Sequence, residues 1–121
     1  MLQEVKNIRQ IPGEPYRRLF YSPNIDLFVW FDPLNQIIGF QLSYRESESE
    51  HAVTWFADRG FVHNEVDSGE GHPGRTKMSP ILVRDGIFKP AQVIEYFKQE
   101  SRELESEIVE FVIRKLRDYP V

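Results

Sequence analysis

The chain has 121 residues, a formal net charge of −4, and a composition that is 40% hydrophobic and 13% aromatic. These values are typical of one folded domain with a single hydrophobic core, and they exclude a disordered chain. Because the sequence contains no cysteine, disulfide frameworks, thiolate zinc sites and cysteine nucleophiles are excluded as well.

The charge is distributed unevenly along the chain. Residues 1–24 contain four basic and two acidic residues, a net charge of +2, which leaves −6 for the remainder. An acidic domain repels phosphate backbones, and Arg17 and Arg18 point to opposite faces of a strand, so ion pairing is favoured over nucleic-acid binding.

Residues 1–7 lack the apolar stretch of a signal peptide, and the longest apolar run, residues 27–31, is far shorter than the ~20 residues of a membrane span. We expect a cytoplasmic domain that binds neither membranes nor nucleic acid.

The first third of the chain predicts strands. Residues 1–12 are compatible with a short edge strand or an ordered arm, and the prolines and glycine that follow break regular structure. Residues 16–21 and 25–31 are rich in β-branched and aromatic side chains, which are typical of strands. The second of these runs is almost entirely apolar, so we expect it to lie near the centre of the sheet.

A hairpin is predicted at residues 32–36. In Asp32-Pro33-Leu34-Asn35, Pro33 suits the second position of a type I turn and Asn35 suits a left-handed residue, so the chain returns along residues 36–44. If Asp32 pairs with Gln36, one face of the hairpin becomes the core, formed by Phe28, Trp30, Ile38, Phe40, Leu42 and Tyr44. The other face is also partly apolar and needs cover from helices or a second subunit; it carries Leu27, Val29, Phe31 and Ile37.

A second hairpin is predicted around residues 58–60, after a polar loop at residues 45–50. Asp58-Arg59-Gly60 suits a three-residue loop with glycine in the left-handed conformation. Pairing of Ala57 with Phe61 then fixes the remaining cross-strand neighbours, which are Trp55 with His63, Val53 with Glu65, and His51 with Asp67.

This second hairpin carries the candidate active site. Two imidazoles and two carboxylates on one face can bind a divalent metal or act as a general acid and base. The candidate catalytic or metal-binding residues are His51, His63, Glu65 and Asp67, and the candidate ligand contacts are Trp55, His72 and Arg75. We favour a simpler interpretation, because the spacings match no metal signature: this face is polar because it meets water. The inward face is then formed by Ala52, Phe56, Val62 and Val66.

The glycine-rich residues 69–76 approach the phosphate-binding pattern GxxxxGK[S/T], with Arg75 at the lysine position. That pattern requires a helix that begins at the loop, whereas Met78-Ser79-Pro80 indicates extended chain. Glu70 would also add a negative charge beside the phosphates. We therefore interpret this segment as a connecting loop, followed by a short strand at residues 80–83.

Residues 90–118 are predicted to be helical, because Pro90 suits a first helical turn and apolar residues recur at helical spacing after it. Between residues 99 and 107 only Leu104 is available for burial. We therefore favour two helices with a break near residues 101–106 over one long helix. A continuous helix would present an apolar seam for dimerisation, but packing on the sheet explains the same residues.

The predicted fold is a single α+β domain over residues 1–121, with four or five antiparallel strands in a meander and one or two C-terminal helices packed on the sheet. The sequence shows no nucleophile with a positioned base and no cofactor fingerprint. We therefore expect a non-catalytic binding or interaction module without a resident cofactor, which associates as a homodimer or binds another protein or a small ligand through the sheet. Aromatic side chains expected at the surface support this interpretation: Tyr16, Phe31, Trp55 and Tyr96.

The alternative is a hydrolase that uses a divalent metal or acid/base chemistry. In that case His63 is the base or a metal ligand, and the carboxylates of Glu65 and Asp67 orient it or bind the metal together with His51.

Overall fold

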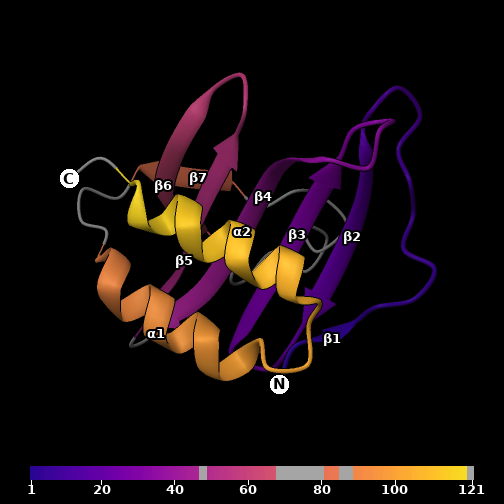
Figure 1. Cartoon of the computed structure of the whole chain (residues 1–121). Helices are drawn as coiled ribbons and strands as arrows, with labels where there is room; N and C mark the ends of the chain where they lie inside the picture. Colours follow the sequence, from indigo (N-terminus) through magenta and orange to yellow (C-terminus); the bar gives the residue numbers. More distant parts are fainter. Residues whose placement is uncertain (47–48, 68–80, 85–88, 120–121) are drawn as a thin grey trace.

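The structure is a computed structural model that describes residues 1–46, 49–67, 81–84 and 89–119. Its strands form one antiparallel sheet in which each strand pairs with the next one along the chain (Figure 1). The seven strands are β1 (Gln3–Glu4), β2 (Tyr16–Tyr21), β3 (Ile25–Phe31), β4 (Ile37–Glu46), β5 (Ser49–Phe56), β6 (Gly60–Asp67) and β7 (Ile81–Arg84). Two helices follow, α1 (Pro90–Glu100) and α2 (Ser106–Arg117). The predicted α+β class and meander are confirmed.

Over the described residues, the sheet has seven strands instead of the four or five expected, because two short strands extend its edges. β1 pairs with β2 through Gln3 and Glu4, and β7 pairs with β6. Both helices lie on the same face of the sheet, so the molecule has two layers (Figure 1). Within the described ranges, no helix has the length and apolar character needed to cross a membrane.

α1 and α2 are separate helices, as the sequence predicted. Pro90 is the first residue of α1, where its missing N–H removes no intrahelical hydrogen bond. The backbone N–H of Ser101 donates to the carbonyl oxygen of Phe97 at 2.9 Å, and α1 ends there. Leu104, in the linker between the helices, packs against the core. The break therefore lies where the sequence offers little else to bury.

The hairpin between β3 and β4 has the predicted turn. Asn35 adopts the left-handed conformation, with a φ of 64°. One carboxylate oxygen of Asp32 accepts hydrogen bonds from the backbone N–H groups of Leu34 and Gln36, each at 2.9 Å. The backbone N–H of Asp32 donates to the carbonyl oxygen of Gln36, also at 2.9 Å. The side chain of Asp32 thus fixes the turn that the sequence indicated.

The predicted register of this hairpin is wrong beyond the first pair, because β4 contains a bulge. Phe31 lies opposite Ile37, but Trp30 lies opposite Gly39, so Ile38 is an extra residue in β4. A shift of one residue moves every later side chain of one strand to the other face. The face that the helices cover consequently combines side chains that the sequence placed on different faces. β3 contributes Ile25, Leu27, Val29 and Phe31, and β4 contributes Phe40, Leu42 and Tyr44 from the expected core.

The hydrophobic core lies between this face and the two helices. The helices contribute six buried side chains: Val93, Ile94 and Phe97 from α1, and Ile108, Val112 and Leu116 from α2. Phe31, which the sequence placed at the surface, is only 7% exposed, because it lies on the face of the sheet that the helices cover (Figure 1). The helices are therefore what covers the apolar face, and no second subunit is needed there.

The second hairpin differs from its prediction by two residues. Gly60 adopts the expected left-handed conformation, with a φ of 77°, but Phe56 pairs with Gly60 and Trp55 with Phe61. A shift of two residues keeps each side chain on its own face. The expected orientation of the faces is nevertheless wrong: Val53 is fully buried beneath the helices, whereas Val62, expected inside, is 48% exposed.

Candidate functional site

The backbone register brings together only part of the predicted histidine and carboxylate cluster. His51 lies opposite Glu65, His63 lies opposite Val53, and Asp67 pairs with Ile81 of β7 instead of with His51. The side chains of His63, Glu65 and Asp67 lie outside the part of the chain that the structure describes, as do residues 68–80 with His72, Arg75 and the glycine-rich loop. Among the described side chains there is no group of three His, Asp or Glu residues that could hold a metal ion.

The two described members of the predicted site, His51 and Trp55, both lie on the helix-covered face of the sheet, beside Val53. The ring of His51 stacks on Tyr44, with centroids 5.5 Å apart. The Trp55 ring lies 5.4 Å from that of Phe111 in α2, and the Nζ atom of Lys115 lies 4.5 Å from the Trp55 ring. Trp55 therefore joins β5 to α2 and is only partly available to a ligand.

Arg17 and Arg18 point to opposite faces of β2, as the sequence predicted. On the helix side, the guanidinium of Arg18 donates two hydrogen bonds of 2.9 Å to the carboxylate of Glu4. A third, of 2.6 Å, reaches Glu105 between the two helices. Arg18 thereby holds the pKa values of the Glu4 and Glu105 carboxyl groups below their usual range. This cluster connects β1, β2 and the helical layer, which is a structural role.

The face of the sheet away from the helices, here called the open face, carries an aromatic row formed by Phe28, Trp30 and Phe56. The ring centroids of Phe28 and Trp30 lie 5.7 Å apart, and those of Trp30 and Phe56 lie 5.0 Å apart. Arginine closes the row at both ends: the Cζ atom of Arg17 is 5.3 Å from the Phe28 ring, and that of Arg59 is 4.6 Å from the Phe56 ring.

Gly39 allows this row to form. In the sheet it lies between Trp30 and Phe56, opposite both of them. A Cβ atom at this position would lie 2.4 Å from the Cδ1 atom of Phe56, so the phenyl ring occupies the space that any other residue would fill. The aromatic row therefore depends on glycine at position 39.

The other end of the open face is acidic. Asp26 and Glu50 lie there, at the opposite ends of β3 and β5 from Trp30 and Phe56. Burial, reinforced by the negative charge of Glu50, raises the pKa of Asp26 to about 6, although a hydrogen bond from Ser43 and the charge of Arg45 act against this. The open face thus has a basic, aromatic end, where Arg59 also lies 3.5 Å from the carboxylate of Asp58, and an acidic end, where Arg45 lies opposite Glu50.

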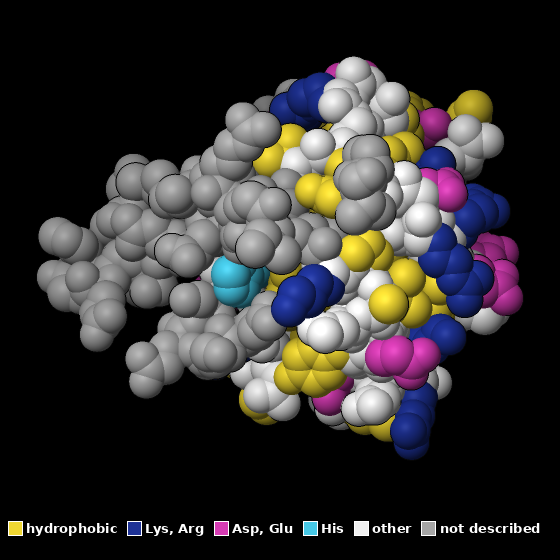
Figure 2. Space-filling model, turned by 90° about the vertical axis from the view of Figure 1, so that its left-hand side faces the viewer, with side chains coloured by type: hydrophobic (Ala, Val, Ile, Leu, Met, Phe, Trp, Pro, Cys, Tyr) yellow, Lys and Arg dark blue, Asp and Glu magenta, His cyan; other side chains and the backbone are white. Residues whose placement is uncertain are grey.

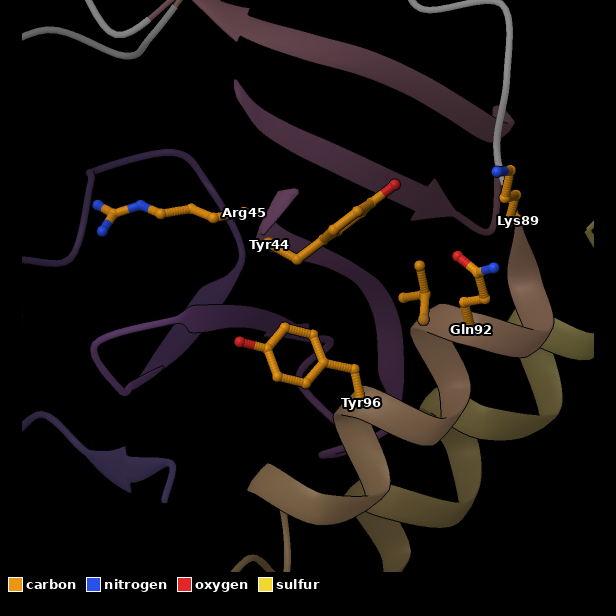
Figure 3. Close-up of a pocket in the computed structure, with 6 residues that line it drawn as sticks. Tyr44, Arg45, Lys89, Gln92 and Tyr96 are labelled. Atoms are coloured by element: carbon orange, nitrogen blue, oxygen red, sulfur yellow. The ribbon is translucent and has the colours of Figure 1, made fainter. Parts of the chain in front are cut away.

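A cavity of about 190 Å³ lies between the end of β4 and the first turns of α1 (Figure 3). Its lining consists of Tyr44 and Arg45 from β4, and Lys89, Gln92, Val93 and Tyr96 from the start of α1. Figure 3 shows Lys89 and Gln92 together at one end, whereas the guanidinium of Arg45 points away. Burial is the main reason that the pKa of Tyr96 is raised.

Sequence reasoning missed both the aromatic row and the cavity. Phe28 and Trp30 were assigned to the core because nothing in the sequence marks the extra residue at Ile38. The residues of the cavity belong to segments distant in sequence and carry no recognisable spacing. Comparison with protein-family models, curated proteins and solved structures found no significant match.

Proposed function

We propose that this chain is a non-catalytic interaction module that associates with a second copy of itself through the open face of its sheet. The observation that carries this proposal is the aromatic row, which has arginines at its ends and lies opposite an acidic end of the same face. Within the described residues, both helices cover the other face (Figure 1).

The composition of the row supports a protein partner. Phenylalanine, tryptophan and arginine are enriched in the centres of protein interfaces, and tryptophan and arginine dominate the binding energy there. Half-buried rings that already contact one another lose little conformational freedom when they are covered. The row therefore has the features of a preformed interface centre.

The distribution of charge supports a second copy as that partner. A twofold axis that lies between two facing sheets and runs across their strands reverses the strand direction of one copy relative to the other. The basic end, with Arg17 and Arg59, then lies over the acidic end, with Asp26 and Glu50. Trp30 lies four positions after Asp26, which corresponds to about 13 Å along a strand. Both ends are therefore matched simultaneously in an antiparallel dimer.

Single-stranded nucleic acid is the other partner that aromatic and arginine side chains can bind, because bases stack on such rings. The net charge of −4 and the acidic end of the open face both disfavour it. Figure 2, which shows a side of the molecule, has basic and acidic side chains interspersed over the described surface. We therefore favour the protein partner, and nucleic-acid binding is an outcome of the test below.

Charge reversal tests the proposal directly. Arg59→Glu makes both ends of the open face acidic, and Glu50→Arg makes both basic, so each variant alone should sediment as a monomer at concentrations where the unaltered chain is dimeric. An equimolar mixture of the two variants should restore the dimer. Trp30→Ser should raise the dissociation constant by about 30-fold, or ~2 kcal/mol. Leu34→Ser, in a turn and 78% exposed, is the control and should have no effect.

Several outcomes would contradict the proposal. One is sedimentation of the unaltered chain as a monomer at every concentration, and another is a mixture of the two variants that stays monomeric. Retention of a single-stranded oligonucleotide that depends on Trp30 would assign the row to nucleic acid instead. The hydrolase alternative stays a prediction, for which the pairing of His51 with Glu65 is the structural support; a native mass that includes a bound metal ion would favour it over the module.

A further inference from the structure

The cavity between β4 and α1 has the size of a small-molecule site. Its volume of about 190 Å³ slightly exceeds the ~150 Å³ of an engineered protein cavity that binds benzene. One six-membered ring with a small substituent therefore fits.

The walls of the cavity suit an aromatic ring. Tyr44 and Tyr96 contribute two aromatic side chains from opposite layers of the molecule (Figure 3), and Val93 also lines the cavity. Tyr44 is held in place by its stacking on His51. Offset or edge-to-face contacts with tyrosine rings favour an aromatic ligand over an aliphatic one of equal size.

One end of the cavity is polar and positively charged. Lys89 and Gln92 lie there, and Figure 3 shows both side chains on the same side of the cavity mouth. The first turn of α1 contains no acidic residue, and the side chain of Lys89 does not cap it. No acidic side chain is among the described residues that line the cavity. A ligand with a negative charge at this end gains an ammonium group and an amide as partners, and no described carboxylate opposes it.

We propose that this cavity binds a small aromatic carboxylate, with its ring between Tyr44 and Tyr96 and its carboxylate toward Lys89 and Gln92. The cavity lies between the end of β4 and α1, whereas the proposed dimer uses the open face. Ligand binding and self-association are therefore separate proposals, and either one can fail alone.

Benzoate and its neutral counterpart benzamide are the probes, titrated into the full chain and followed by backbone amide shifts in nuclear magnetic resonance spectra. We expect benzoate to shift the signals of Gln92, Val93 and Tyr96, with a dissociation constant on the order of 1 mM, as is usual for a ligand with so few atoms. Benzamide should bind at least about 5-fold more weakly, because it lacks the charge that Lys89 attracts.

Three variants make the test specific. Lys89→Gln should weaken benzoate binding about 5-fold without changing benzamide binding. Lys98→Gln removes an exposed lysine from the same helix, away from the cavity, and should change neither. Gln92→Trp should abolish binding of both probes, because the larger side chain fills the cavity mouth. Gln92 is exposed, so this variant should fold, which the unchanged spectrum of the sheet would verify.

Equal affinities for benzoate and benzamide, or equal effects of Lys89→Gln and Lys98→Gln, would overturn the assignment of the carboxylate. The cavity is not the binding site if benzoate causes no shift at a concentration 10-fold above its expected dissociation constant. The same conclusion follows if the probes still bind to the Gln92→Trp variant.

Discussion

Replacement of Gly39 by alanine tests whether the aromatic row depends on this glycine. The new Cβ atom would lie 2.4 Å from the Cδ1 atom of Phe56 and 2.5 Å from its Cε1 atom, so the ring must move. Gly39 does not have a positive φ, so alanine meets no backbone strain at this position. The effect of Gly39→Ala should therefore come from the ring of Phe56 alone.

The structure gives the sign and the size of this effect. Forcing an extra methyl group into a packed site costs about 1–3 kcal/mol, whereas replacing glycine by alanine within a strand gains about 0.5–1 kcal/mol. Gly39→Ala should consequently lower the free energy of unfolding, by up to about 2.5 kcal/mol. In a Phe56→Ala background the clash is absent, and the same substitution should raise the free energy of unfolding by about 0.5–1 kcal/mol.

The unaltered chain, the two single variants and the double variant form a double-mutant cycle. Their unfolding in urea measures the coupling energy between positions 39 and 56, provided that the dependence of the free energy of unfolding on urea concentration is the same in all four proteins. We expect a coupling energy of about 1–3 kcal/mol, which equals the cost of the clash. If Gly39→Ala destabilises both backgrounds equally, then the ring of Phe56 is not what requires glycine, and the proposed structure of the row is wrong.

Two further predictions concern titratable groups. The pKa of Asp26 is raised from 3.8 to about 6, so the native state binds this proton more tightly than the unfolded chain does. The free energy of unfolding should therefore fall as pH rises from 4 to 6. Asp26→Asn should remove this dependence on pH and raise the free energy of unfolding at pH 7, measured in urea, by about 2 kcal/mol. Arg18→Met should cost about 1–2 kcal/mol at pH 7. Because Arg18 lowers the pKa values of Glu4 and Glu105, this loss should shrink as pH falls below 4.5, and an equal loss at pH 3 would contradict the ion-pair role.

Local sequence signals predicted the elements well. The turn at Asp32–Asn35 forms because an aspartate side chain, a proline and an asparagine each satisfy one of its requirements within four residues. Gly60 marks the second hairpin for a similar reason, since it adopts a positive φ. The break between α1 and α2 falls where apolar periodicity weakens. In each case the responsible physical interaction is local, so a short stretch of sequence contains it.

The candidate sites were much harder to predict, because they depend on contacts between distant segments. The cavity requires Tyr44 of β4 and Tyr96 of α1 to face each other across two layers. The role of Arg18 depends on Glu105, which is 87 positions away. Neither contact leaves a periodic or spaced pattern, so composition and periodicity cannot locate it.

The two register errors show why the open face in particular escaped prediction. In the second hairpin the register moved by two residues, an even number, so Trp55 and Val53 kept a common face even though their partners changed. In the first hairpin the bulge at Ile38 shifted the register by one residue, an odd number. The residues of β3 that the sequence assigned to the core therefore lie on the open face. One extra residue in β4 therefore places Phe40, Leu42 and Tyr44 on the same face as Leu27, Val29 and Phe31, which the helices cover, and leaves Phe28 and Trp30 on the other face. It leaves an aromatic surface that the alternation of the sequence alone assigns to the interior, and the proposed interface depends on that bulge.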